Sequence, residues 1–90
     1  MSNTYVKSVE RSLHKYYGSN IKLFPSSRKD KKFMVLTPDN KKVHFGQKGY
    51  DDYHTTKDEE KRKRFLQRNA RWVNAPKWTP AHLAYWVLWN

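Results

Sequence analysis

Apolar residues near the start of the chain recur at helical spacing. They repeat every three or four positions: Val6, Val9, Leu13, and Tyr16 or Tyr17. This period predicts an amphipathic helix over 4–17, with Gly18 at the position where helices commonly end. Another face of the same helix carries bases at i, i+4 and i+8: Lys7, Arg11 and Lys15. This stripe is either a solvated face or a surface that contacts phosphates.

The next stretch contains short β-rich runs separated by turn residues. We predict strands over three ranges: 21–24, 32–37 and 41–45. The segment 37–40, Thr-Pro-Asp-Asn, has the chemistry of a tight turn and should connect the last two strands. Alternation places four side chains on one face, which we expect to pack on the first helix: Phe33, Val35, Val43 and Phe45. Met34 and Leu36 point the other way and need separate cover.

Residues 46–56 are predicted to form a loop. Gly46 and Gly49 are expected to adopt backbone angles that other residues avoid. Asp51 and Asp52 are interpreted as caps of backbone amides or as partners of nearby bases. A metal or acid–base site would need further ligands at suitable spacing, and the neighbouring sequence lacks them.

A charged helix is predicted to follow this loop. Thr56 as N-cap and Glu59 three residues later form a capping box, and the helix should extend to about Asn69. Three acids precede bases at i, i+4, which stabilises a helix: Asp58–Arg62, Glu59–Lys63 and Glu60–Arg64. The acids lie near the N-terminus and the bases near the C-terminus, as the helix dipole favours. Local helix stability therefore accounts for much of this charge.

The same segment still carries a positive excess, with seven bases and three acids over 57–71. The bases are candidates for binding an anionic partner or nucleic acid: Lys57, Lys61, Arg62, Lys63, Arg64, Arg68 and Arg71. The alternative is a solvated face whose charges are paired along the helix. We expect the basic residues and the aromatic C-terminal residues to lie on different surfaces of the protein.

Aromatic residues dominate the stretch 72–90. Thr79 followed by Pro80 predicts the start of a short helix that is apolar at almost every position. Such a helix either closes the core of the domain or forms an interface with another protein. The candidate protein-interface residues are Trp72, Trp78, Tyr85, Trp86 and Trp89. Base stacking on these rings ranks lower, because their neighbours are Val and Leu rather than Lys and Arg.

Composition narrows the function further. The 90 residues predict one small basic domain, 1–90, with a formal net charge of +11 that favours an anionic partner. The chain has no cysteine, no apolar run of signal-peptide or membrane-spanning length, and no phosphate-binding glycine loop. The four histidines are not at zinc-ligand spacing. We therefore expect a protein that is not an enzyme, with no cofactor, no metal and no membrane span.

Together these patterns predict an α+β fold. The N-terminal helix precedes a small antiparallel β-meander of two to three strands. A charged helix and a short Trp-rich C-terminal helix follow.

Four segments resemble a family of short basic proteins encoded by nucleocytoplasmic large DNA viruses. The segments are Lys41-Lys-Val-His-Phe-Gly, Lys48-Gly-Tyr-Asp-Asp-Tyr, Lys57-Asp-Glu-Glu-Lys-Arg-Lys-Arg-Phe, and Trp78 with the terminal Tyr85-Trp-Val-Leu-Trp-Asn. The resemblance covers about 40–90. The family has no established chemistry, so it implies no catalytic residue here. It implies a viral gene product, found in the virion and inside the infected host cell during assembly.

Two functions are expected on these grounds. The first is a structural component of a large DNA virus particle, a minor capsid or core-associated protein. Its Trp-rich face would contact other virion proteins such as the major capsid protein, and its basic face an acidic partner. The second is binding of nucleic acid, such as DNA, without strong sequence specificity. An adaptor for acidic host proteins is a third hypothesis, which no feature of the sequence favours.

Overall fold

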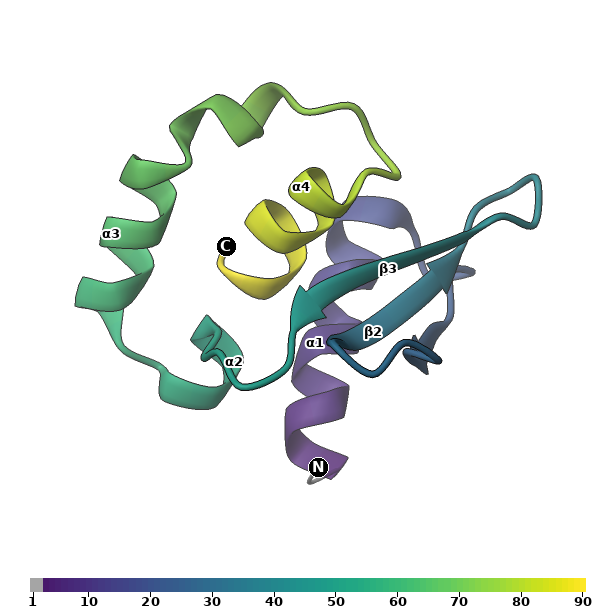
Figure 1. The fold of residues 1–90 in the computed structure, drawn as a ribbon, viewed down its shortest axis with the longest axis horizontal. Helices are drawn as coiled ribbons and strands as arrows, with labels where there is room; N and C mark the ends of the chain where they lie inside the picture. Colours follow the sequence, from purple (N-terminus) through teal and green to yellow (C-terminus); the bar gives the residue numbers. More distant parts are fainter. Residues whose placement is uncertain (1–2) are drawn as a thin grey trace.

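A three-stranded sheet and a set of helices make up the computed structural model, which describes residues 3–90 (Figure 1). Helix α1 spans Asn3–Tyr17. The strands are β1, Leu23–Pro25; β2, Lys31–Leu36; and β3, Lys42–Gln47. The later helices are α2, Tyr53–Thr56; α3, Glu59–Arg68; the 3₁₀ helix η1, Ala70–Asn74; α4, Pro80–Leu83; and the π-helical turn η2, Ala84–Leu88. The predicted α+β fold is confirmed, with three strands in the sheet.

The sheet is an antiparallel meander in the order β1-β2-β3. Phe33 pairs with Phe45 and Val35 with Val43, so the predicted apolar face is present. Phe33, Val35 and Phe45 are buried there, as the alternation along β2 and β3 requires. On the opposite face Met34 and Leu36 are half-buried, so the cover expected for them is only partial.

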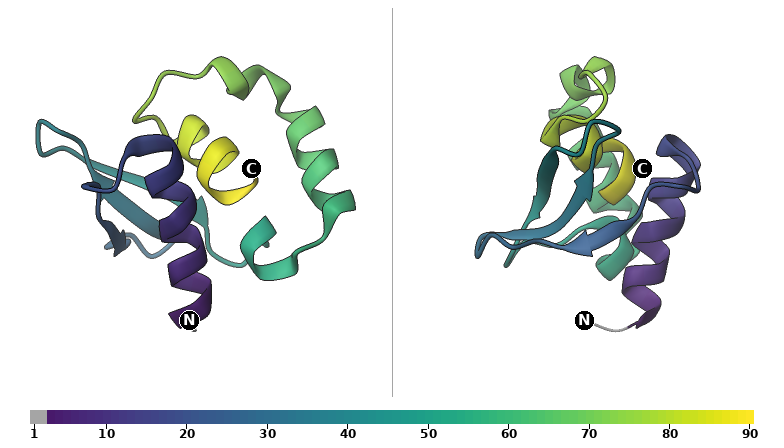
Figure 2. Two further views of the ribbon diagram at one scale, coloured as in Figure 1. Left: turned by 180° about the vertical axis from the view of Figure 1, so that it is seen from behind. Right: turned by 90° about the vertical axis from the view of Figure 1, so that its right-hand side faces the viewer.

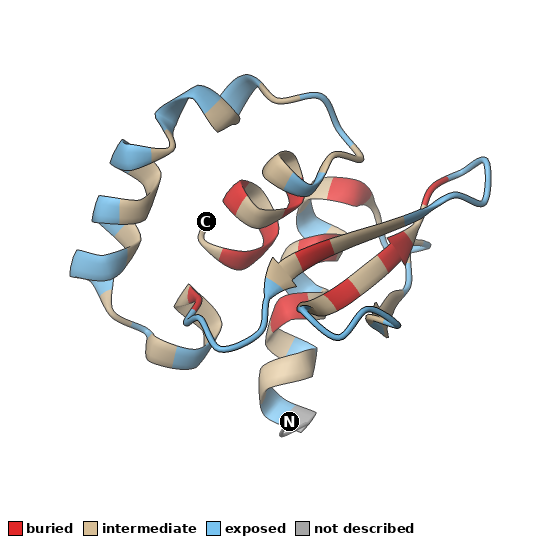
Figure 3. Ribbon diagram, in the orientation of Figure 1, coloured by how far each residue is buried: buried red, intermediate tan, exposed pale blue. Residues whose placement is uncertain are grey.

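The core lies between this sheet face, α1 and the C-terminal helix. Figure 2 shows the C-terminal helix beside both the sheet and α1. Buried residues, red in Figure 3, concentrate on these elements. Val9 and Leu13 of α1 meet Leu83 and Val87 of the C-terminal segment, and all four are fully buried. Burial of each such side chain contributes about 1.5–3 kcal/mol. The C-terminal helix therefore packs with α1 in the core, in agreement with the alternative in which it closes the core of the domain.

The C-terminal helix begins as predicted from its cap. The Thr79 hydroxyl accepts the backbone N–H of His82 at 3.3 Å, and Pro80 occupies the first turn. The helix then widens into η2, where the Trp89 N–H donates to the Ala84 carbonyl at 3.2 Å. Its buried side chains include Tyr85, in agreement with a helix that is apolar nearly all round.

The region before α3 differs from the predicted loop. Residues 53–56, which were predicted as part of the loop, form the short helix α2. Its N-cap is Asp52. Lys57 then adopts a left-handed conformation with φ of 53° and separates α2 from α3. The predicted capping box of Thr56 and Glu59 is therefore wrong. Asp58 caps α3 instead, because its carboxylate accepts two backbone N–H groups of the first turn, at 3.0 and 3.3 Å.

The ion pairs of α3 also differ from the prediction. Among residues 3–90, no ion pair within 4.0 Å joins the acids and bases predicted to pair at i, i+4. Arg62 instead pairs with Glu59 at i, i+3, and Lys61 pairs with Asp51 in the preceding segment. Lys61 therefore pairs with an acid outside α3, whereas Arg62 pairs with an acid of its own helix at a different spacing from the one predicted.

Helix α3 and η1 form an arc around the C-terminal helix (Figure 1). Neither α3 nor η1 has a fully buried residue. None of the helices within residues 3–90 has the length and apolar character needed to span a bilayer.

Candidate binding groove

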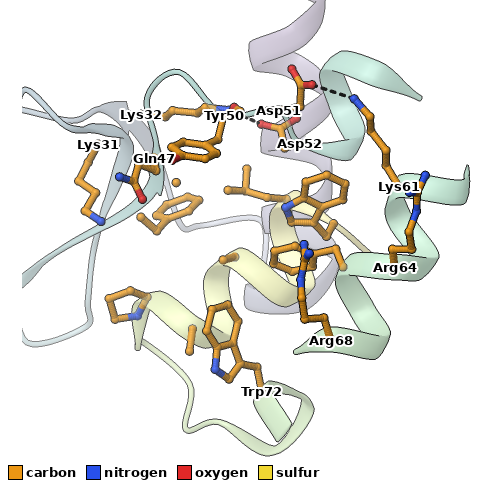
Figure 4. A pocket seen from close by; sticks show the side chains of 18 residues that line it. Lys31, Lys32, Gln47, Tyr50, Asp51, Asp52, Lys61, Arg64, Arg68 and Trp72 are labelled. Carbon is orange, nitrogen blue, oxygen red and sulfur yellow. Dashed lines mark hydrogen bonds and ion pairs between the residues drawn. The ribbon is translucent and has the colours of Figure 1, made fainter. Parts of the chain in front are cut away.

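The groove between α3 and the C-terminal helix is the candidate functional site (Figure 4). It has a volume of about 660 Å³, and strand β3 closes its third side. One aromatic contact sets the position of α3: the Phe65 and Trp89 rings stack with centroids 4.6 Å apart and planes 12° from parallel. The volume falls within the range of about 300–1,000 Å³ that is common for ligand sites.

The inner surface of the groove is largely apolar. Helix α3 contributes Phe65, η1 contributes Trp72, and β3 contributes Phe45. The C-terminal helix supplies the remaining apolar residues: Pro80, Ala81, Ala84, Leu88 and Trp89. These side chains come from four elements, so the groove exists only in the folded chain.

Cations line the outer parts of the groove. Lys61, Arg64 and Arg68 lie at i, i+3 and i+7 on one face of α3, and Figure 4 shows them along the same side. Lys31 and Lys32 lie across the groove on β2. The sequence-predicted basic set is therefore partly gathered on a single wall.

Two aspartates also line the groove, and both are held by lysines. Asp52 is 1% exposed and accepts from Lys32 Nζ at 3.1 Å, from the Tyr5 hydroxyl at 2.5 Å and from the Thr55 N–H at 3.1 Å. Asp51 is exposed and pairs with Lys61 at 3.1 Å. The interpretation of both residues as caps or ion-pair partners is confirmed.

The remaining cations of the groove have no acidic partner. Lys31, Arg64 and Arg68 form no ion pair within 4.0 Å in the part of the chain that the structure describes. Arg64 does donate from Nε to the Glu60 carbonyl one turn earlier, at 3.3 Å. Across residues 3–90, only four of the nineteen lysines and arginines are in ion pairs. The positive charge of the groove is therefore available to a ligand.

Tyr50 stands at the groove with its ring largely in solvent. It is 68% exposed, the most exposed large hydrophobic residue of residues 3–90. Its backbone is nevertheless anchored, because Lys32 Nζ donates to its carbonyl at 2.5 Å. The position of Tyr50 is thus defined while its ring remains accessible (Figure 4).

Other members of the predicted basic set lie elsewhere. Arg62 is directed into the protein, where Nε donates to the Trp89 carbonyl at 3.1 Å. The Lys57 ammonium lies 5.9 Å from the centre of the Tyr53 ring. Lys63 and Arg71 are exposed and do not line the groove. The structure thus assigns three of the seven to the groove and one to the stability of the fold.

The predicted interface aromatics fall into two clusters. Trp72 and Trp89 lie in the groove, on either side of Phe65. Trp78, Tyr85 and Trp86 belong to a second cluster on α1 and the C-terminal helix. The aromatic and basic surfaces were expected to be separate, but the groove unites part of each. The reason is the reversal of the chain after η1, which brings the C-terminal helix back against α3.

The second cluster is held by the hydroxyl of Tyr17. This hydroxyl accepts the Trp78 N–H at 3.3 Å and donates to Nδ1 of His82. The Trp78 ring meets the Tyr17 ring edge-on, with centroids 4.8 Å apart. Burial raises the Tyr17 pKa to about 12, so the hydroxyl keeps its proton at neutral pH. This cluster serves packing and does not line the groove.

His54 links α2 to the C-terminal helix and to α1. Its Nε2–H donates to the Val87 carbonyl at 2.7 Å, so Nδ1 is free to accept the Ser8 hydroxyl at 2.7 Å. Burial lowers the pKa of His54, and the hydrogen bond to Val87 and the charge of Asp52 offset this effect only in part. His54 is therefore neutral at pH 7 and acts as a structural link.

Several groove residues were absent from the sequence-based candidates. Lys31, Phe45 and Tyr50 come from the sheet and the following loop, where we predicted no binding residue. A solitary tyrosine between a glycine and two aspartates carries no local signal of exposure. Only the path of the chain brings these residues opposite α3.

Comparison with known proteins gives a family match. A family model described as a family of unknown function (DUF5754) matches residues 21–69, more than half of the chain. The matched region contains the sheet, α2 and α3, and it ends before the C-terminal helix. Neither a curated protein nor a solved structure matches the chain.

Proposed function

Because the chain belongs to DUF5754, a family of unknown function, we propose its function from the groove: non-enzymatic binding of nucleic acid without strong sequence specificity. One observation carries this proposal. Lys61, Arg64 and Arg68 line one wall of a groove whose inner surface is aromatic and apolar. Cations that follow a groove lined with aromatic rings suit a phosphate backbone and its bases.

The chemistry of the side chains supports phosphate as the anion. The Arg64 and Arg68 guanidiniums are planar forks that bind phosphate oxygens with two parallel hydrogen bonds. Both are exposed and have no acid within ion-pair distance in residues 3–90. Contacts to phosphate carry no sequence information directly, so weak sequence specificity is expected.

The test is the salt dependence of binding to a random-sequence DNA oligonucleotide, measured by fluorescence anisotropy. Each neutralised phosphate contributes a slope of about −0.7 on single strands and about −0.9 on duplex DNA in a plot of log K against log salt. The double variant Arg64→Gln/Arg68→Gln should make the slope shallower by about one to two units.

A second double variant serves as the matched control. Lys63→Gln/Arg71→Gln also removes two positive charges from exposed positions in the same region, but outside the groove. It should change the slope much less than the groove variant. An equal change of slope in the two double variants would exclude the groove as the binding site. Binding that does not depend on salt would exclude the proposed function.

A second proposed role is a structural component of a large DNA virus particle, a minor capsid or core-associated protein. The resemblance to short viral proteins motivates it, and the distribution of charge supports it. Lysines and arginines without an ion-pair partner lie on several surfaces besides the groove, including the α1 stripe of Lys7, Arg11 and Lys15. A protein packed among acidic partners inside a particle would use several such surfaces at once.

Quantitative mass spectrometry of purified particles tests this role. The protein should be present in a fixed ratio to the major capsid protein, and its removal should impair particle assembly. Its absence from purified particles would exclude the structural role. That outcome would leave binding of nucleic acid inside the infected cell unaffected.

A further inference from the structure

We infer that the groove takes unpaired nucleobases, so that the preferred partner is a single strand rather than a duplex. This inference rests on the proposed binding of nucleic acid and names the form that fits. It follows from the position of aromatic rings relative to the free cations. Tyr50 and Trp72 line the groove together with Arg64 and Arg68 (Figure 4).

The cations and the aromatic rings are positioned so that a single strand of nucleic acid could contact both. On the α3 side, Arg64 and Arg68 are one helical turn apart, and Trp72 follows in the next element, η1. A backbone that follows the two guanidiniums can therefore turn its bases toward the apolar interior. The exposed ring of Tyr50 lies on the opposite side of the groove and offers a face for stacking.

A duplex cannot use these features. Its bases are already stacked on their neighbours, and only their edges are accessible in the grooves. Unpaired bases can instead be splayed out and stacked on aromatic side chains or on guanidinium planes. A groove that binds only phosphates gains nothing from an apolar interior, whereas unpaired bases would bury that surface from water.

An acidic peptide fits the groove less well. Carboxylates would satisfy Lys31, Arg64 and Arg68, but they would leave the apolar inner surface of the groove uncovered. The accessible aromatic surface at Tyr50 requires a flat apolar partner that alternates with negative charge. A nucleic acid strand has both features in each nucleotide, whereas a peptide needs a special sequence to provide them.

The experiment compares three ligands of equal length by fluorescence anisotropy: an oligothymidine strand, the corresponding duplex, and an abasic strand with the same phosphates. The wild-type protein should bind oligothymidine at least about five-fold more tightly than the abasic strand, as expected for one stacked base. Tyr50→Ala and Trp72→Leu should each reduce this ratio. Tyr50→Phe keeps the ring and should preserve it.

The control is Val73→Ala, which removes exposed apolar surface next to Trp72 but outside the groove lining, and it should leave the ratio unchanged. Thermal unfolding verifies that every variant is folded. Tyr50→Ala is the most informative of them, because its side chain is largely in solvent and its anchored carbonyl is retained.

The outcomes separate this inference from the function on which it rests. Equal affinity for the abasic and base-bearing strands, or for the duplex, would overturn the preference for single strands and leave phosphate binding intact. Equal competition by polyglutamate would show that charge alone is recognised, and would also overturn it. An unchanged ratio in Tyr50→Ala and Trp72→Leu would place the bases outside the groove. Binding to none of the three ligands would refute the proposed function itself.

Discussion

The guanidinium of Arg62 binds the backbone carbonyl of Trp89, with Nε 3.1 Å from the oxygen. The same group donates to Asn90 Oδ1 at 3.3 Å and to Glu59 at 3.4 Å, and it lies 5.5 Å from the centre of the Tyr53 ring. A residue from the middle of the basic run therefore joins α3 to the C-terminal segment. Its charge serves the fold, whereas that of its neighbours faces solvent or the groove.

Replacement of Arg62 should destabilise the protein. Arg62→Gln is expected to lower the free energy of unfolding by about 1.5 kcal/mol, because a charge-assisted hydrogen bond is lost. Arg62→Lys should not restore stability, since an ammonium lacks the planar fork that reaches several acceptors. Urea unfolding measures the effect. The neighbouring Lys63→Gln is the control and should change stability by less than about 0.5 kcal/mol.

The two adjacent aspartates should respond very differently to the same substitution. Asp52→Asn leaves the ammonium of Lys32, which is 12% exposed, without its carboxylate, and should cost about 3 kcal/mol. Asp51→Asn breaks only an exposed ion pair and should cost less than about 1 kcal/mol. Chemical denaturation of both variants measures the difference. Similar values for the two would show that the buried network at Asp52 does not support the fold.

Stability should decrease on acidification below about pH 6.5. Burial lowers the pKa of His54 in the folded protein, so the unfolded chain, with a pKa near 6.5, binds the proton more readily. The contribution is fully present above pH 6.5 and is lost as the pH falls toward the folded-state value. Burial also lowers the pKa of His82, which acts in the same direction.

Thermal unfolding between about pH 7.5 and pH 5 measures this dependence. In His54→Gln the melting temperature should vary less with pH, because the amide does not titrate but can still donate toward Val87. A wild-type melting temperature that rises on acidification would contradict the assignment of His54 as a buried neutral side chain.

Gly46 should be less replaceable than Gly49, although both have positive φ angles, of 75° and 85°. A Cβ atom at Gly46 would lie 3.1 Å from Leu88 Cδ1 and 3.3 Å from Lys32 Cβ, whereas at Gly49 it would meet no atom within 4 Å. Gly49→Ala should therefore cost about 1 kcal/mol for the backbone conformation alone. Gly46→Ala should cost about 2 kcal/mol or more, since it also crowds the core. Equal costs in urea unfolding would show that the contact with Leu88 is easily relieved.

Periodicity was sufficient for much of the fold. Burial on one face explains why Phe33, Val35 and Phe45 could be assigned from alternation alone. Local patterns were less reliable where two candidate caps lie close together: Thr56 and Asp58 can both cap a helix, and the left-handed turn at Lys57 decides between them. Sequence spacing does not reveal that turn.

The candidate site was only half predictable. The basic residues of α3 could be identified from the sequence. Which of them face the groove could not, because this depends on the position at which the C-terminal segment, with Trp89, packs against α3. The i, i+4 pairs favoured a solvated helix stabilised by its own charges. In the folded protein Lys61 and Arg62 find partners outside α3, and these partners orient the helix so that Arg64 and Arg68 line the groove.

The contact between Phe65 and Trp89 has a consequence for the order of events during synthesis. A nascent chain that has been made only as far as α3 carries the basic residues but lacks one wall of the groove, because that wall comes from 80–89. Under the proposed function, nucleic acid that meets such a chain on the ribosome would engage its charges but not the completed site. Binding in the groove would then require that 80–89 have first folded against α3.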